Sequence, residues 1–453
     1  MPVETFANLL ASNIGSLAFL LNPTPEFETF RVQPSAPPVE AEVPGDHLFG
    51  EWGRLRHKWS DHGFEFTVQY TGEVAGNVSG GVKRGTVYNG LLNVASDVNL
   101  EKAAGWKGGS FHAAMLFPHG RSLTDHYVND LFVTSNLDAS DNVHLFELWL
   151  EQGLFDGKFS VRAGVMAVDQ EFAFTEQGVL FGASEFGWFP IAGINVTAPV
   201  YPQGAPGVRV KWQPSEFTYA QAAVVDGNVN PLDSAGRETN PHGVEFRFDE
   251  GALVLAEAGH KWKLHAKPGT LKVGGWYHTA THADVRLDNF GRSLADPLSS
   301  GLPRSHAGNW GLYLAAEQNL WKKKPADKAS TRAVGIFGRL GYAPPDRNTL
   351  DLYAEGGVTS TGLIPSRDDD LCGLGVAYGK LSRDLRALGR DQNTFSGTSV
   401  PLPDHELVLE LEYKIKAYRG CSVQPGLQYI VHPGGSAAVD DALVLSLRTV
   451  FDF

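Results

Sequence analysis

The chain has 453 residues, including 51 glycines and 3 methionines, and a formal net charge of −13. A pI near 5.6 argues against a nucleic-acid partner, because nucleic-acid binding normally needs a basic surface. A hydrophobic content of 42% and a mean hydropathy of −0.18 argue against membrane-spanning helices. They do not exclude a transmembrane β-barrel, in which apolar residues alternate with polar ones along each strand.

The amino-terminal region is expected to divide into three parts before the barrel begins. Residues 1–22 carry an apolar run that we interpret as a signal remnant, although basic residues do not precede it. Residues 23–47 are rich in Pro and Glu and indicate an extended linker. Residues 48–62 place Trp52, Leu55 and Trp59 at helical spacing, which predicts a short amphipathic helix packed at the foot of the barrel.

From residue 63 to the end, the period of the sequence changes to two. Phe64, Phe66, Val68 and Tyr70 alternate with polar residues, as in a strand with one lipid face and one wet face. The fold class is therefore all-β: a transmembrane antiparallel β-barrel. The same alternation predicts about sixteen strands, an even number as in bacterial barrels, near residues 64–76, 86–100, 109–117, 143–152, 157–167, 207–214, 216–226, 243–260, 268–281, 306–321, 332–342, 349–361, 370–382, 405–418, 420–431 and 440–453.

The last strand alternates up to its terminal aromatic residue, Phe453. A membrane barrel needs such a strand, because the last strand must pair with the first to leave no edge in lipid. We expect this strand to be recognised by the barrel-assembly machinery.

The connections between the expected strands alternate between short and long. Short turns belong to the periplasmic side of such barrels and long loops to the outer side, which places both termini in the periplasm. The segment 168–206 is then the third outer loop. It is so rich in aromatic residues that we expect it to fold into the barrel and narrow it. Within 243–260 the alternation changes parity, and we interpret Gly251 as a β-bulge.

The two cysteines, Cys372 and Cys421, are too few for a disulfide framework or a zinc site. They are expected two strands apart, about 9.6 Å at about 4.8 Å per strand spacing. Disulfide α-carbons lie within about 7 Å, so we expect free thiols.

Residues of the inward parity should line the lumen. They mix both charge signs with planar aromatic side chains, which suits small neutral sugars rather than ions, since ion-selective pores carry rings of one sign. The candidate lining residues are Glu73, Arg84, Asn89, Asn93, Glu147, Trp149, Arg162, Glu171, Trp188, Trp276, Arg339, Glu355 and Arg448. Of these, Glu147, Trp149, Arg162, Glu171 and Trp188 are expected near the narrowest point.

Enzymatic interpretations have weaker support. Glu147 and Glu151 share a strand face like a glycosidase pair, but such carboxylates are more often solvated lining. His278 and His282 lack an evident third ligand, so we expect solvated histidines rather than a metal site. The sequence contains no nucleophile elbow and no P-loop. We expect no catalytic residue, no metal and no cofactor.

Several motifs in order resemble the carbohydrate-selective porins of the OprB family. They are L-F-G-E-W-G-R-L-R (48–56), Y-T-G-E-V-A-G-N-V-S-G-G-V-K-R-G (70–85), D-V-N-L-E-K-A-A-G-W-K-G-G (97–109), L-W-L-E-Q-G-L-F-D-G-K (148–158) and K-V-G-G-W-Y-H-T (272–279). The resemblance implies a sixteen-stranded outer-membrane barrel that admits glucose and other small sugars through a passage lined by charged residues. Glu73, Arg84, Glu147 and Phe172 match the family pattern, whereas Val165 stands where family members often have Arg.

We therefore expect a passive sugar channel, monomeric or trimeric, in the outer membrane of a Gram-negative bacterium, in contact with outer-membrane lipid. The alternatives are a general-diffusion porin, an outer-membrane barrel enzyme such as a lipid hydrolase, and a secreted soluble glycan-binding protein or glycosidase.

Overall fold

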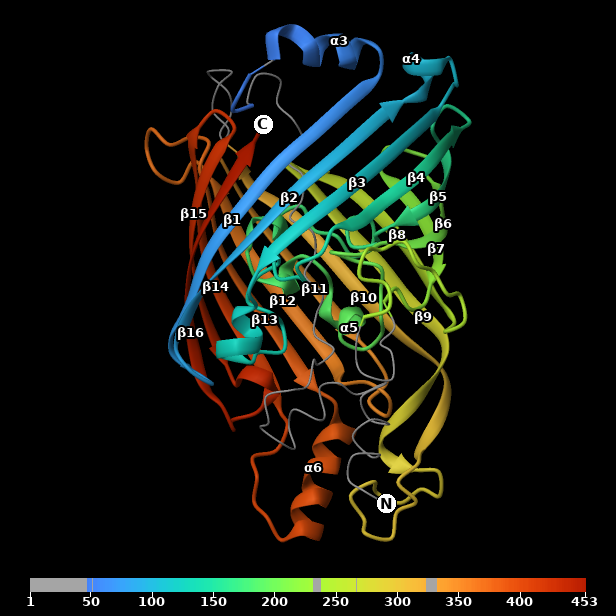
Figure 1. The fold of residues 1–453 in the computed structure, drawn as a ribbon, viewed down its shortest axis with the longest axis vertical. Helices are drawn as coiled ribbons and strands as arrows, with labels where there is room; N and C mark the ends of the chain where they lie inside the picture. The colour runs from blue at the N-terminus through green and yellow to red at the C-terminus, as the bar shows by residue number, and fades with distance from the viewer. Residues whose placement is uncertain (1–46, 51, 231–237, 266, 323–331) are drawn as a thin grey trace.

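Sixteen antiparallel strands close into one barrel in the computed structural model (Figure 1). The structure describes residues 47–453 except 51, 231–237, 266 and 323–331. Each strand pairs with its neighbours in sequence, and β16 returns to β1. The strands are β1 (Phe64–Gly81), β2 (Gly85–Asn99), β3 (Gly109–Gly120), β4 (His144–Leu154), β5 (Phe159–Met166), β6 (Ala205–Trp212), β7 (Thr218–Asp226), β8 (Ala252–Leu264), β9 (Lys267–Asp288), β10 (Pro303–Lys322), β11 (Ala333–Tyr342), β12 (Leu350–Thr361), β13 (Leu371–Leu381), β14 (His405–Tyr418), β15 (Cys421–Val431) and β16 (Asp440–Asp452).

The seam between β1 and β16 carries the closure that the C-terminal pattern predicts. Glu73 lies opposite Arg448 in the register, and their side chains form a buried ion pair with Nη2 to Oε2 at 2.7 Å. At the end of the seam, Phe453 N–H donates to Val68 O over 2.9 Å. The final strand is thus paired to its last residue, which leaves no free sheet edge there.

The two ends of the barrel differ in their connections (Figure 1). One end, here called the α3 end, carries short turns and the helices η1 (Trp52–Arg54), α3 (Leu55–Asp61) and α4 (Leu100–Ala104). The predicted N-terminal helix is present there as η1 and α3. The other end, called the α6 end, carries the longer connections. Their helical segments are η2 (Thr124–Val128), η3 (Gly178–Leu180), η4 (Ser184–Phe186), α5 (Pro190–Gly193), α6 (Arg383–Ser396) and η5 (Pro433–Gly435).

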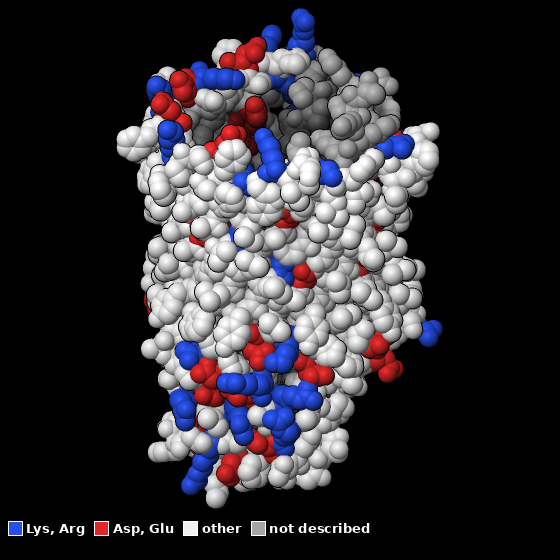
Figure 2. All heavy atoms as spheres, turned by 180° about the vertical axis from the view of Figure 1, so that it is seen from behind, with Lys and Arg blue, Asp and Glu red and all other residues white. Residues whose placement is uncertain are grey.

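Alternation along the strands separates an apolar outside from a polar inside. Leu445 and Leu447 are 46% and 49% exposed on β16, whereas Arg448 is 6% exposed. Figure 2 shows a band of mostly uncharged residues around the middle of the barrel, with charged residues concentrated towards both ends. None of the helices among the described residues is long and apolar enough to cross a bilayer.

Two local expectations were wrong. Residues 243–250 are not strand, and β8 begins at Ala252, so Gly251 is not a bulge within a strand. The alternation there is misleading because β7 ends at Asp226, its partner in register is Ala252, and earlier residues have no strand to pair with.

His278 and His282 are also not solvated: they are 5% and 8% exposed and their rings meet with Nδ1 to Nε2 at 3.2 Å. The free thiols of Cys372 and Cys421 are confirmed. The predicted signal remnant (1–22) and nearly all of the Pro-rich linker (23–47) lie outside the described residues.

The apolar outer face predicts how a charge would act on it. Leu445→Arg places a guanidinium on the lipid face in mid-strand and should cost about 2–4 kcal/mol of unfolding free energy in lipid vesicles. The matched control is Val82→Arg, in the exposed turn after β1, which should cost about 0–1 kcal/mol. Urea titration followed by tryptophan fluorescence measures both, and equal costs would contradict this assignment of the outer face.

Candidate functional site

The lumen is narrowed by the connection between β5 and β6, residues 167–204, here called the inner loop. Its large side chains are buried against the inside of the wall: Phe172, Phe181, Phe186, Trp188 and Phe189 are each 1% exposed. Phe181 and Phe186 pack on Phe337 of β11, with ring centroids 5.7 Å and 6.1 Å away. The expectation that this loop folds inward is confirmed.

Arg339 of β11 anchors the inner loop to the barrel wall. Its guanidinium binds the Glu355 carboxylate with Nε and Nη2 at 2.7 Å and 3.0 Å. Nη1 donates to the carbonyls of Ala173 and Gly187, and Nη2 donates to that of Glu185 at 2.7 Å. All five N–H donors of the guanidinium are therefore used. Because the charge is fully buried, only this complete pairing makes it tolerable.

Glutamates on the strands of the barrel wall also anchor the inner loop, because their carboxylates accept hydrogen bonds from its backbone N–H groups. Glu257 of β8 accepts from Ala173 N–H at 2.8 Å, and Glu317 of β10 accepts from Gln177 N–H at 2.8 Å. Glu410 of β14 accepts from Gly182 N–H at 2.8 Å and from Ala183 N–H at 3.1 Å. Buried irregular backbone needs such partners because each unpaired polar group would cost free energy.

Four charged side chains form a closed cluster where the inner loop meets β4, β5 and β6. This cluster is called the charged ring and consists of Glu151, Arg162, Glu171 and Arg209. Arg162 binds both carboxylates, with Nη2 to Glu151 at 2.8 Å and Nη1 to Glu171 at 2.7 Å. Arg209 approaches the same two carboxylates, each at 2.8 Å. The two arginines are opposite in the strand register, and the carboxylates neutralise a repulsion that would otherwise destabilise the pair.

Trp149 lies beside the charged ring with both ring faces occupied. On one side, His112 of β3 stacks on it with centroids 5.0 Å apart and planes 17° from parallel. On the other side, the Arg162 guanidinium carbon lies 3.6 Å from the indole centroid. Since β3 and β5 flank β4, these two groups cover opposite faces. Trp149 therefore positions Arg162 through a cation–π contact and has no free face for stacking.

Several charged side chains at and near the charged ring are partly exposed. The side chains of Glu151, Glu171 and Arg162 are 20%, 18% and 16% exposed, and that of Asp97 is 54% exposed. His112 links Asp97 at 2.7 Å to Glu147 at 3.5 Å. In Figure 2, the α3 end of the barrel is hollowed, with charged side chains around and within the hollow. Glu151, Arg162, Glu171 and Asp97 are thus accessible to solvent, unlike the fully buried side chains of Arg339 and Glu355.

The predicted lining residues fall into separate groups. Glu147, Trp149, Arg162 and Glu171 come together at the charged ring, whereas Arg339 and Glu355 anchor the inner loop, and Glu73 and Arg448 close the seam. Asn89 and Asn93 are buried on β2, and Trp188 and Trp276 are buried at 1% and 4% exposure. Arg84 is exposed in the turn between β1 and β2, away from these groups.

Sequence reasoning missed the role of Arg209 and of the wall glutamates. Strand parity points Arg209, Glu257 and Glu410 inward, but parity does not say which inward groups meet the inner loop. The direction of the Glu171 side chain could not be predicted from strand alternation, because Glu171 belongs to an irregular segment.

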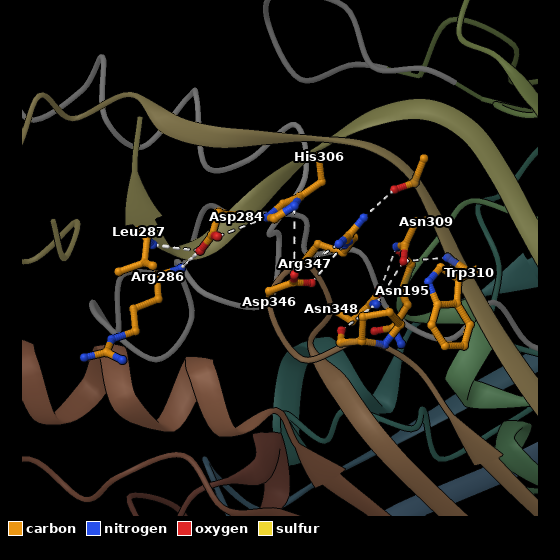
Figure 3. Close-up of polar contacts among 12 residues, drawn as sticks. Asn195, Asp284, Arg286, Leu287, His306, Asn309, Trp310, Asp346, Arg347 and Asn348 are labelled. Carbon is orange, nitrogen blue, oxygen red and sulfur yellow. Dashed lines mark hydrogen bonds and ion pairs between the residues drawn. The ribbon is translucent and has the colours of Figure 1, made fainter. Parts of the chain in front are cut away.

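At the α6 end, polar side chains join Asn195 of the inner loop to Asn309 of β10 and to Asn348 of the β11–β12 connection (Figure 3). Asn309 and Asn348 exchange side-chain amide hydrogen bonds of 2.7 Å and 2.9 Å. Asn195 of the inner loop donates to Leu350 O and accepts from Leu350 N–H.

Beside the Asn309–Asn348 pair lies a chain of ionisable groups in which His306 contacts Asp284 at 3.0 Å and Asp346 at 3.9 Å. Burial alone would raise the pKa of Asp346, but the Arg347 guanidinium and His306 hold it below its ordinary value. These paired ionisable groups are here called the α6-end network.

Comparison with known proteins agrees with this architecture. Residues 83–453 match the model of the family described as "Carbohydrate-selective porin, OprB family". The chain is 28% identical to Porin B of Pseudomonas aeruginosa over 89% of this chain and 91% of that protein. It is 25% identical to the putative porin QuiX of Acinetobacter baylyi over 90% and 93% of the two chains. Among solved structures, the high-pH structure of Pseudomonas putida OprB superposes with a TM-score of 0.81 at 26% identity, covering 91% of this chain and all of that one.

The Arg339 anchor predicts the effect of removing its charge. Arg339→Met leaves the buried Glu355 carboxylate without its counter-charge, with the Tyr353 hydroxyl as a remaining hydrogen-bond donor, and takes the guanidinium donors away from three loop carbonyls. It should cost about 3–5 kcal/mol of unfolding free energy. The loosened inner loop should also raise the mean single-channel conductance and its noise in planar bilayers. Arg84→Met, in the exposed turn, is the matched control and should change neither quantity. An unchanged conductance in a folded Arg339→Met barrel would contradict the anchoring role.

Proposed function

The chain belongs to the carbohydrate-selective porin family OprB, and from this premise we propose that glucose and other small neutral sugars cross beside the charged ring. The family is one of passive outer-membrane channels, so the protein is a porin and not an enzyme. The observation that supports the proposed route is the partial exposure of Glu151, Arg162 and Glu171 where the lumen is open.

The chemistry of the charged ring suits sugar hydroxyls. A hydroxyl both donates and accepts, so it can bind a carboxylate and a guanidinium that lie side by side. The ring holds two positive and two negative groups and therefore offers strong hydrogen bonds without a net charge that would select ions. Because the four groups already bind each other, a sugar only partly replaces existing bonds. Binding then stays weak enough for release, which conduction requires.

This route differs from sugar selection by aromatic stacking. Both faces of Trp149 are covered, and Trp188 and Trp276 are buried. We infer that aromatic residues here position the charged groups and fill the wall, while hydrogen bonds to the passing hydroxyls provide the preference. A general-diffusion porin, the alternative, would order solutes by size alone.

The same proposal includes the orientation and the assembly of the barrel. Short turns lie at the α3 end, so we infer that this end and both termini face the periplasm, as in other bacterial barrels. The apolar outer band contacts outer-membrane lipid, the strand ending at Phe453 is offered to the barrel-assembly machinery, and the channel acts as a monomer or a trimer.

Liposome swelling tests the route. Glu171→Gln keeps the shape of the side chain but removes one negative charge of the ring, so Arg162 and Arg209 leave the ring with a net positive charge. We expect the ratio of glucose entry to entry of a neutral amino acid to fall severalfold. Glu216→Gln, in the exposed turn between β6 and β7, is the matched control and should leave the ratio unchanged.

If Glu171→Gln keeps the wild-type ratio while folding normally, the charged ring does not select sugars. If the wild type itself orders solutes only by size, the general-diffusion alternative holds.

A further inference from the structure

Two histidines and an aspartate converge at the α6 end, away from the charged ring and the inner loop. Asp404 ends the connection between β13 and β14, His405 begins β14, and His432 directly follows β15. One ligand atom from each side chain lies within 4.8 Å of the other two. His405 Nδ1 is 3.1 Å from Asp404 Oδ2, and the two imidazole centroids are 4.8 Å apart.

The backbone holds these three residues in place. Asp404 N–H donates to Gly435 O at 2.9 Å, and Leu381 N–H donates to Asp404 O at 2.9 Å. His432 N–H donates to Asp441 Oδ1 at 3.1 Å. These bonds fix the β13–β14 and β15–β16 connections to the strand ends in the protein without a bound ion. Ion binding would therefore need little further ordering of the backbone and would cost little conformational entropy.

His432 has an unusual backbone conformation and an unusual side-chain environment. Its φ is +52°, in the left-handed region that non-glycine residues rarely adopt. Its Nδ1 is buried and, among the described residues, has no hydrogen-bond partner. A buried imidazole nitrogen left without a partner costs free energy, and a bound cation would remove that cost.

We propose that Asp404, His405 and His432 form a binding site for a divalent transition-metal ion such as Zn²⁺. Two imidazoles and a carboxylate are ligands that Zn²⁺ prefers, and water would complete the tetrahedron. Zn²⁺ binds such atoms at about 2.0–2.2 Å, so small side-chain rotations must draw the three groups together. The ion would link the β13–β14 connection, which contains α6, to the β15–β16 connection. The site is independent of the sugar route.

One neighbouring charge opposes a cation at this site. The opposing group is Arg386 of α6, whose Nη1 is paired with Asp404 Oδ1. Its side chain is 42% exposed, so it can turn towards solvent.

Calorimetric titration of the intact, detergent-refolded chain with ZnCl₂ tests the proposal, with MgCl₂ as the comparison ion. We expect one saturable Zn²⁺ site, at least tenfold weaker in His405→Ala and in His432→Ala, and no matching Mg²⁺ site. His306→Ala, in the α6-end network, is the matched control and should keep the wild-type affinity. Removing the competing charge in Arg386→Gln should tighten Zn²⁺ binding by up to about tenfold, since about 1.4 kcal/mol of repulsion corresponds to that factor.

Equal Zn²⁺ affinity in the wild type and both histidine variants would overturn the proposal, as would the absence of saturable binding. Co²⁺ gives a second readout, because tetrahedral coordination by the two imidazoles should produce visible absorption that either histidine variant loses. Unchanged circular dichroism of the metal-free variants excludes misfolding as the cause of a loss.

Discussion

The structure depends on one constraint, which is that the irregular backbone inside the barrel must find hydrogen-bond partners within the inner loop, in neighbouring segments or on the wall. The inner loop crosses the lumen without regular secondary structure over most of its length, and water reaches little of it. Glu257, Glu317 and Glu410 accept from its N–H groups, while Arg339 donates to its carbonyls. Polar wall residues that look like channel lining in the sequence are therefore largely structural, and they set how wide the remaining lumen can be.

Burial then separates the charged groups into two kinds. Arg339 and Glu355 form a completely buried ion pair that holds the inner loop. Removing either partner would leave an isolated buried charge and destabilise the fold. In the charged ring, Glu151, Arg162 and Glu171 are partly exposed, whereas Arg209 is buried. We propose that the three exposed groups exchange protein partners for solute hydroxyls. The same residue types thus anchor the inner loop in one place and form the proposed sugar contacts in the other, and the two places differ in solvent access.

The strands could be predicted from the sequence because a two-residue period is a local property of the chain. This holds for β1, for β16 with its terminal Phe453, and for the inward parity of Arg162 and Arg448. It fails at 243–250, where alternation is present but the neighbouring strand is too short to pair. The inward folding of the inner loop followed from its aromatic content, because Phe181 and Phe186 would be poorly solvated outside.

The detailed site was beyond the sequence because it depends on contacts between distant segments. Trp149 has a lumen-facing position, and only the stacking of His112 and Arg162 shows that its faces are covered. Arg209 meets Glu171 only because the inner loop returns to the wall near β6. Trp188 and Trp276 could not be assigned to the passage or to the packed interior without knowing where the inner loop lies.

The most direct test of the central claim is an experimental structure of the protein soaked with glucose. The account predicts a sugar beside the charged ring, with hydroxyl oxygens at about 2.7–3.2 Å from the carboxylates of Glu151 or Glu171 and from the guanidinium of Arg162. Glucose stacked on an aromatic side chain away from these groups, with the charged ring intact and unoccupied, would contradict it.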